Sequence, residues 1–262
     1  MANDWNFPAG DLMKGKRGLV MGVANQNSIA WGISQQLVAQ GAELAFTYQG
    51  ETLERRVRPL VESVGMDFMV PADVTNDAEM DTAFGAIKER WGKIDFLVHS
   101  IAFAGKDELQ GSMVANTTRE GFARAMDISV YSFIDCARRA SEIMPSREEG
   151  GGSIICLTYL GAERTVPSYN VMGVAKAGLE AATRYAARSI TGRSLKARFS
   201  NAHDIIRRHG ALGPKIGQAY DRTTALFPAW HNLRSPARAI NEGINRNIHR
   251  AGKSFARRIG HH

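Results

Sequence analysis

Residues 18–32 read Gly-Leu-Val-Met-Gly-Val-Ala-Asn-Gln-Asn-Ser-Ile-Ala-Trp-Gly. The first five residues form a short apolar run that predicts a strand, and the apolar spacing over Ile29–Gln40 predicts a helix. The turn between them is suited to a phosphate, because the first N–H groups of a helix lack intrahelical partners. The glycine spacing is neither Gly-x-Gly-x-x-Gly nor a P-loop. A tight turn without a ligand is therefore an equally good interpretation of this stretch alone.

The same alternation of short apolar runs and helical spacing continues along the chain. Further strand-like runs lie at 42–48, 67–71, 94–100 and 152–158, and helical patterns lie at 52–65, 78–91, 119–145 and 169–188. Strands that alternate with helices indicate βαβ units and a parallel sheet. We therefore predict an α/β fold: a Rossmann-like, doubly wound parallel sheet in a single domain.

Composition excludes several classes of protein. The chain has 262 residues, of which 44% are hydrophobic, and no apolar run approaches the roughly 18 residues of a membrane helix. The first residues lack the basic and apolar regions of a secretory signal. Cys136 and Cys156 have the spacing of neither a disulfide framework nor a metal site. We expect a cytoplasmic protein with no membrane span and no metal.

Residues that follow the predicted strands suggest a nucleotide site. Thr47-Tyr-Gln-Gly50 has no basic neighbour before Arg55, so a 2′-phosphate would lack a partner and NADH is favoured over NADPH. Asp73 follows the third strand, where its carboxylate either accepts from an adenine amino group or closes a turn. Ser100, Ile101 and Ala102 end the fourth strand, at the point where such sheets bind ligands.

Tyr169 and Lys176 form a candidate catalytic pair. They are seven residues apart, so on one helix their directions would differ by about 20°. A phenol and an ammonium on one face are suited to stabilising an oxyanion, and the ammonium would lower the pKa of the phenol. The alternative is two solvated residues on a helix face.

Six stretches resemble one family: 22–32, 45–49, 98–104, 119–122, 127–129 and 159–176. Over about residues 12–188 the chain resembles enoyl-acyl-carrier-protein reductases of bacterial type II fatty-acid synthesis, within the short-chain dehydrogenase/reductase superfamily. General ketoreductases of that superfamily usually carry a serine 13 residues before the catalytic tyrosine. Here Cys156 occupies that position and a second tyrosine, Tyr159, follows it, as in the enoyl reductases.

The resemblance implies that NADH reduces the trans-2 double bond of an enoyl thioester borne by acyl carrier protein, in a homotetramer. Tyr169 would hydrogen-bond the enolate, Lys176 would hold the nicotinamide ribose, Tyr159 would line the acyl site and Ala104 would face the acyl chain. His99 ends an apolar strand, and we expect it to be structural. The implied cofactor residues are Gly22, Ser28 and Ile29 at the pyrophosphate, Gln49 at the adenosine ribose, Asp73 and Val74 at adenine, and Ser100, Ile101 and Ala102 along the cleft.

Beyond Arg188 the family pattern is lost. The sixth strand of the Arg-Val-Asn-Ala-Ile type and the last family strand are not evident in the sequence. Basic residues outnumber acidic ones 14 to 3 after residue 188, against 19 to 23 up to it, within a total charge of +7. We therefore divide the chain into a dinucleotide-binding and catalytic domain, 1–188, and an atypical basic C-terminal segment, 189–262. A frameshift, a recombination or a redesigned tail would explain the break.

The C-terminal segment has a helical pattern. Apolar residues recur every three or four positions from Ile240 to Ile259 among basic ones, which predicts a basic amphipathic helix starting near Ser235. It would pack on the domain, contact an acidic partner such as acyl carrier protein, or bind nucleic acid or anionic membrane; nucleic acid is not expected. Three functions stay open: a working reductase, a nucleotide-binding domain with poor turnover, and a binding protein acting through its tail.

Overall fold

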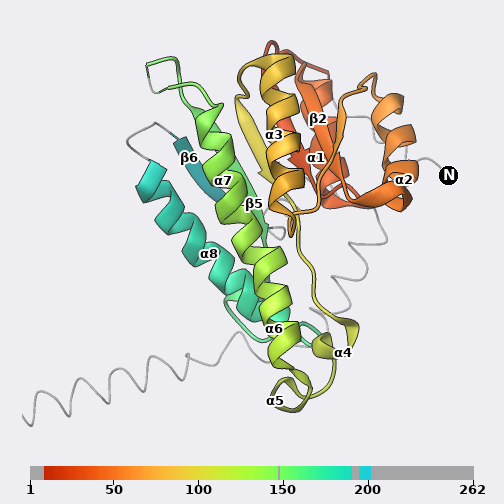
Figure 1. The fold of residues 1–262 in the computed structure, drawn as a ribbon, viewed down its shortest axis with the longest axis vertical. Coiled ribbons are helices and arrows are strands. Elements are labelled where there is room, and N and C mark those ends of the chain that lie inside the picture. Colours follow the sequence, from red (N-terminus) through yellow and green to blue (C-terminus); the bar gives the residue numbers. More distant parts are fainter. Residues whose placement is uncertain (1–8, 147, 191–194, 202–262) are drawn as a thin grey trace, which may run out of the picture. The chain divides into compact units, whose positions relative to one another are not determined.

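The computed structural model describes residues 9–146, 148–190 and 195–201 (Figure 1). In this range one parallel sheet has the strand order β3-β2-β1-β4-β5-β6. Its strands are β1 (Arg17–Met21), β2 (Glu43–Tyr48), β3 (Met69–Pro71), β4 (Phe96–His99), β5 (Gly152–Thr158) and β6 (Leu195–Asn201). The helices are α1 (Ile29–Ala39), α2 (Gly50–Ser63), α3 (Asp77–Trp91), α4 (Lys106–Leu109), α5 (Met113–Asn116), α6 (Arg119–Met126), α7 (Ser132–Glu142) and α8 (Asn170–Ile190). The predicted Rossmann-like sheet is confirmed.

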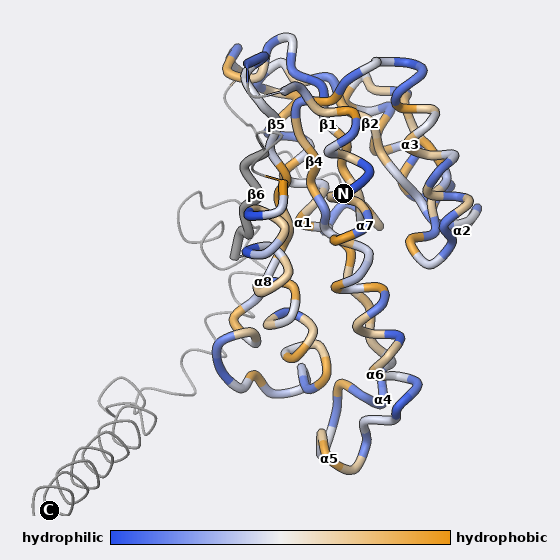
Figure 2. Tube along the Cα trace, turned by 60° about the vertical axis from the view of Figure 1, so that its left-hand side comes forward, coloured by the Kyte–Doolittle hydropathy of each residue, from blue (hydrophilic) through white to orange (hydrophobic). Residues whose placement is uncertain are grey.

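Successive residues of each strand supply two separate cores. Leu19 of β1 and Leu97 of β4 pack with α3, α7 and α8, whereas Val20 and Val98 pack with α1 and α2. All four side chains are buried. Because neighbouring residues in a strand point to opposite faces, apolar strands of this kind need helices on both sides. Figure 2 shows the matching alternation of hydrophobic and hydrophilic residues along α3 and α8.

The predicted helix over 119–145 is interrupted. Its middle turn, η1 (Asp127–Tyr131), is a π-helix between α6 and α7. Figure 1 shows the three elements following one another with little change of direction, with α7 beside α8. A π-turn inserts an extra residue into the helical repeat and is frequent at functional sites. Here Ser129 of the π-turn exchanges hydrogen bonds with the backbone of Phe103, which follows β4.

The expectation that the sixth strand is absent was wrong. β6 pairs in parallel with β5 from Gly152 opposite Leu195 to Thr158 opposite Asn201. Its sequence, Leu-Lys-Ala-Arg-Phe-Ser-Asn, alternates apolar and polar residues, which is a strand pattern. The residues of this strand do not match the family motif, and they lie within a basic segment, so the motif alone does not predict the strand. The predicted boundary at residue 188 stays a prediction, and the last family strand and the helix near Ser235 lie outside the described residues.

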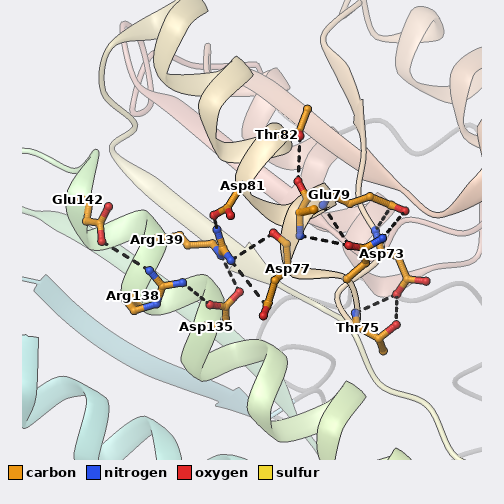
Figure 3. A network of polar contacts seen from close by, with 12 residues as sticks. Asp73, Thr75, Asp77, Glu79, Asp81, Thr82, Asp135, Arg138, Arg139 and Glu142 are labelled. Carbon is orange, nitrogen blue, oxygen red and sulfur yellow. Dashed lines mark hydrogen bonds and ion pairs between the residues drawn. The ribbon is translucent and has the colours of Figure 1, made fainter.

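A buried arginine joins α3 to α7 (Figure 3). The guanidinium of Arg139 is 7% exposed and donates to Asp135 on its own helix at 2.7 Å and to Asp81 on α3. Burial opposes the charge on Arg139, but the hydrogen bonds from Arg139 to these carboxylates raise its pKa overall. The network secures α3, which begins close to Asp73. None of the described helices has the length and apolar character needed to cross a membrane.

Candidate cofactor and active site

A pocket of about 270 Å³ lies at the carboxyl ends of β1 and β4. These neighbouring strands are where the strand order reverses, the usual ligand site of such sheets. Its volume is near the lower end of the roughly 300–1,000 Å³ typical of ligand pockets. Predicted cofactor residues in its lining are Gly22, Gln49, Asp73, Val74, Ser100, Ile101 and Ala102. Predicted residues outside its lining are Ser28, Ile29, Ala104, Tyr159, Tyr169 and Lys176.

Gly22 lies at a position where no side chain would fit. Its φ is +94°, and a Cβ added there would lie 2.1 Å from the carbonyl oxygen of Ser100. Glycine therefore allows the turn after β1 to approach the end of β4. A glycine at this tight strand-to-helix turn fits a dinucleotide, since such folds place the pyrophosphate beside the turn.

Ser28 stabilises the turn before α1. Its hydroxyl oxygen accepts hydrogen bonds of 3.0 Å from the N–H groups of Ala24 and Asn25. It makes no side-chain bond to the N–H groups of α1, which starts at Ile29. The first turn of α1 consequently keeps donors for an anion. This geometry supports the predicted place of Ser28 and Ile29 beside a pyrophosphate.

Asp73 and Gln49 form the polar end of the pocket. The Gln49 amide donates to Asp73 Oδ2 at 2.7 Å, and the N–H and hydroxyl of Thr75 donate to Oδ1 at 2.9 and 2.7 Å. Burial opposes ionisation of Asp73, but these three hydrogen bonds lower its pKa overall. Asp73 thus closes a turn and also presents a carboxylate to the pocket, so the two interpretations of this residue are compatible.

Two tyrosines meet between β5 and α8. Tyr159 follows β5, and its ring centroid lies 5.0 Å from that of Tyr169. Tyr169 stands just before α8, where its carbonyl accepts from the Gly173 N–H at 3.1 Å. The residues on either side of it, Ser168 and Asn170, have positive φ angles of 57° and 22°. Such angles are uncommon outside glycine, so this segment holds Tyr169 in a constrained backbone.

Lys176, on α8, is a buried residue. It is 6% exposed, and its ammonium donates to the carbonyl of Leu157 at 2.6 Å. Burial lowers its pKa to about 8. The alternative of a solvated Lys176 therefore does not hold. The prediction that Lys176 lowers the pKa of Tyr169 is also wrong: burial, followed by the neighbouring Tyr159, raises that pKa. The phenol is therefore neutral at ordinary pH and is able to donate a hydrogen bond.

His99 has the features of a structural residue. It is 1% exposed, its Nε2 lies 2.8 Å from the hydroxyl of Ser132, and its ring meets Phe133 edge-on at 5.7 Å. The Ser132 hydroxyl itself donates to the carbonyl of Ile128, so His99 Nε2 is the donor in their contact. Burial lowers the pKa of His99 to about 3. A neutral imidazole in this environment fits the structural role.

The pocket also contains residues that the sequence analysis did not single out. Phe103 follows β4, Arg124 lies on α6 and Ile128 lies in the π-turn. Phe103 and Ile128 were within family stretches without a role assigned to them, whereas Arg124 lies between the stretches 119–122 and 127–129. No local pattern marks Arg124, because its place in the lining depends on where α6 runs relative to the end of β4. Others in the lining are Val23, Ala24, Thr47, Tyr48, Leu53 and Ala72.

Known proteins resemble this chain over most of its length. Residues 22–198 match the family described as Enoyl-(Acyl carrier protein) reductase. A Rhizobium meliloti (strain 1021) protein called enoyl-[acyl-carrier-protein] reductase [NADH] 2 is 53% identical over 227 residues, 87% of this chain and 80% of the relative. The FabI enoyl reductase [NADH] of Rickettsia felis is 45% identical over 194 residues, 74% of this chain and 73% of the relative. The family match passes residue 188, the end expected from the motifs, and reaches into β6.

Solved structures show the same relationship and the same fold. The enoyl-(acyl-carrier-protein) reductase of Anaplasma phagocytophilum, solved with NAD, has a TM-score of 0.70 and 45% identity, and the match covers 74% of this chain and 73% of that one. The Bacillus cereus enoyl-acyl carrier protein reductase, solved with NADP+ and an indole naphthyridinone, has a TM-score of 0.68 and 47% identity, over 73% and 72% of the two chains. From the pocket at the strand-order reversal, the tyrosine pair and these matches, the chain belongs to the enoyl-acyl-carrier-protein reductase family.

Proposed function

We propose that the chain catalyses NADH-dependent reduction of the trans-2 double bond of enoyl thioesters carried on acyl carrier protein. The observation that carries this proposal is the contact between Tyr159 and Tyr169 just after β5, the strand that pairs with β4, whose carboxyl end lines the pocket. When bound, NADH supplies a hydride to the β-carbon of the thioester. Family membership supports this reaction, since the relatives described above are enoyl reductases.

Tyr169 stabilises the charge that develops on the thioester oxygen. Its phenol is neutral because burial raises its pKa, so it donates a hydrogen bond to the forming enolate. Tyr159 lines the acyl site beside it, and Ala104 faces the acyl chain. Lys176, fixed by the carbonyl of Leu157, holds the nicotinamide ribose. The α-carbon then takes a proton, which completes the reduction.

The remaining cofactor contacts follow the pocket. Gly22, Ser28 and Ile29 meet the pyrophosphate, and Gln49 lies near the adenosine ribose. Asp73 and Val74 frame the adenine. Ser100, Ile101 and Ala102 line the cleft at the end of β4. The protein acts in the cytoplasm as a homotetramer, with acyl carrier protein as its partner and without nucleic acid.

One pair of measurements separates this function from the alternatives. Stabilisation by NADH in thermal unfolding distinguishes a nucleotide-binding protein from one that acts only through its basic tail. NADH oxidation with crotonyl thioester then distinguishes an active reductase from a domain with poor turnover. Tyr169→Phe should reduce turnover by roughly 10²- to 10⁴-fold, the range for a lost acid–base group. Tyr185→Phe is the matched control, because Tyr185 lies on α8 with 75% of its surface exposed.

The outcomes are distinct. Equal turnover in Tyr169→Phe and the parent would remove Tyr169 from the mechanism. NADH binding without turnover in the parent would favour the second function, in which the altered C-terminal segment prevents catalysis. Absence of both binding and turnover would leave the tail-dependent function.

A further inference from the structure

The cofactor pocket has only two charged side chains in its described lining: Asp73 and Arg124. A dinucleotide brings two negative charges on its pyrophosphate, so Asp73 opposes binding and Arg124 favours it. Among the described residues Arg124 has no ion-pair partner. Its guanidinium is therefore available to a ligand.

The position of Arg124 is set by its contact with Phe103. The guanidinium carbon lies 4.7 Å from the centroid of the Phe103 ring. Stacking of this kind holds an arginine in place while leaving its N–H groups free to donate. Both residues line the pocket, so the free donors are at its edge.

Phe103 is in turn fixed by the π-turn. Its N–H donates to the hydroxyl of Ser129 at 3.0 Å, and that hydroxyl donates to the Phe103 carbonyl at 3.2 Å. Ser129 is completely buried within η1. Two reciprocal hydrogen bonds therefore join the segment after β4 to η1, which continues directly from the helix that carries Arg124. The wall of the pocket formed by Phe103, Arg124 and Ile128 is one connected unit.

We propose that Arg124 forms an ion pair with the pyrophosphate of the dinucleotide cofactor. This inference rests on the proposed function and adds a binding residue to it. The pyrophosphate is the group concerned because it carries the negative charge of the cofactor, and Asp73, the other charged residue of the described lining, would repel an anion placed beside it. Gly22, whose turn allows close backbone approach, lines the same pocket. An arginine paired with a phosphate makes short, charge-assisted hydrogen bonds, which are stronger than neutral ones.

Titration calorimetry with NADH tests the pair. Arg124→Met, which retains a flexible side chain without the charge, should weaken NADH binding about tenfold. Arg124→Lys should recover much of that loss, because a point charge still attracts phosphate. Arg119→Met is the matched control: Arg119 lies on the same helix and is exposed, but is outside the lining of the pocket. The Arg119→Met variant should bind NADH with the affinity of the parent. Melting curves should show that all variants fold.

Nucleotide fragments identify the group that Arg124 meets. In Arg124→Met the affinity for ADP should fall about as much as that for NADH, while the affinity for adenosine should be unchanged. Raising the salt concentration should narrow the difference between parent and variant for ADP. If Arg124→Met lost as much affinity for adenosine as for ADP, Arg124 would be stacking on the base, and the inference would be overturned. A greater loss for 2′-AMP than for ADP would place the guanidinium at the 2′ position and would also overturn it.

Failure of the inference and failure of the proposed function look different. A parent chain that binds NADH, with the same affinity in Arg124→Met, overturns the ion pair and leaves the reductase function standing. A parent chain that binds neither NADH nor ADP overturns both.

Discussion

The rings of Tyr159 and Tyr169 lie with their centroids 5.0 Å apart and their planes tilted by 59°. Tyr159 directly follows β5, and Tyr169 lies in the turn before α8. The contact therefore joins these two elements at the carboxyl end of β5. Each ring limits the positions open to the other. The contact also contributes to the raised pKa of Tyr169, because two phenols side by side disfavour a phenolate.

Tyr159→Phe and Tyr159→Ala should therefore have different effects. Phenylalanine keeps the ring that supports Tyr169, so kcat should fall less than about tenfold. Alanine removes that support, and kcat should fall by a further factor of about ten, as expected when a catalytic group is misplaced. The affinity for NADH should be unchanged in both variants, since the proposed place of Tyr159 is at the acyl site and not at the cofactor. Steady-state kinetics with an enoyl thioester checks this, and equal losses in the two variants would contradict the supporting role.

Lys176 predicts how activity depends on pH. Its pKa is lowered to about 8 by burial, and the proposed role uses the ammonium form. Activity should thus decline as pH rises through about 8, rather than near the ordinary lysine pKa of about 10.4. A pH profile of kcat/KM checks this, and a flat profile up to pH 10 would show that the charge on Lys176 is not needed.

The same group predicts how stability depends on pH. Because the folded-state pKa of Lys176 is below that of the unfolded chain, the unfolded state binds more protons between pH 8 and about 10.4. Stability contributed by Lys176 should consequently rise across that window and be lost as pH falls through 8. Urea unfolding at pH 8 and pH 10 should show a gain on the order of 2–3 kcal/mol in the parent relative to Lys176→Met. The raised pKa of Tyr169 has the opposite effect: it lowers stability as pH rises, but only above about pH 10.

Five strands of the sheet were predictable because each is a short apolar run, and in β1, β2 and β4 successive buried residues lie on both faces. β1 and β5, for example, lie within one residue of the runs at 18–22 and 152–158. The sixth strand does not match the family motif, and only the alternation of apolar and polar residues over Leu195–Asn201 marks it in the sequence. The π-turn at Asp127–Tyr131 was also not predictable, since one extra residue per turn leaves the helical spacing almost unchanged over so short a stretch.

The ion-pair network around Arg139 predicts a large difference between two adjacent arginines. Arg139→Met should lower the free energy of unfolding by up to about 3–5 kcal/mol, because the buried carboxylate of Asp135 then keeps only the largely exposed Arg138 as an ion-pair partner. Arg138→Met should cost less than about 1 kcal/mol, since the Arg138 side chain is 57% exposed. Urea unfolding of both variants checks this. Similar small losses in the two variants would mean that Arg138 alone compensates the charge of Asp135 when Arg139 is absent.

The site was less predictable than the fold. The motifs identified Gly22, Gln49 and Asp73 because each follows a strand directly, and their position then depends on the sheet alone. Arg124 depends on the path of a later helix past β4, which no local pattern contains. The direction of the Tyr169 pKa shift was wrong for a similar reason: sequence spacing gives the nearness of a lysine but not the burial of the phenol, and burial has the larger effect here.

Gly161 explains how Tyr169 keeps its position. Gly161 lies in the 3-10 turn η2 (Leu160–Ala162), and a Cβ added to it would lie 2.4 and 2.8 Å from Cδ1 and Cε1 of the Tyr169 ring. Its φ lies outside the left-handed range, so alanine can adopt the same backbone. The effect of Gly161→Ala must therefore come from contact with the ring. The ring would have to shift from its position beside Tyr159.

We expect Gly161→Ala to lower kcat at least tenfold while leaving the affinity for NADH unchanged, and to reduce stability by about 1–3 kcal/mol through overpacking. The stability loss should disappear in a Tyr169→Ala background, because the atoms that collide are then gone. This double-mutant cycle is measured by urea unfolding and does not depend on turnover. Gly85→Ala is the control: it lies on α3 with open space around it, so it should keep activity and gain up to about 1 kcal/mol. A loss in Gly161→Ala that persists without the tyrosine ring would mean that Gly161 acts through its own backbone rather than by positioning Tyr169.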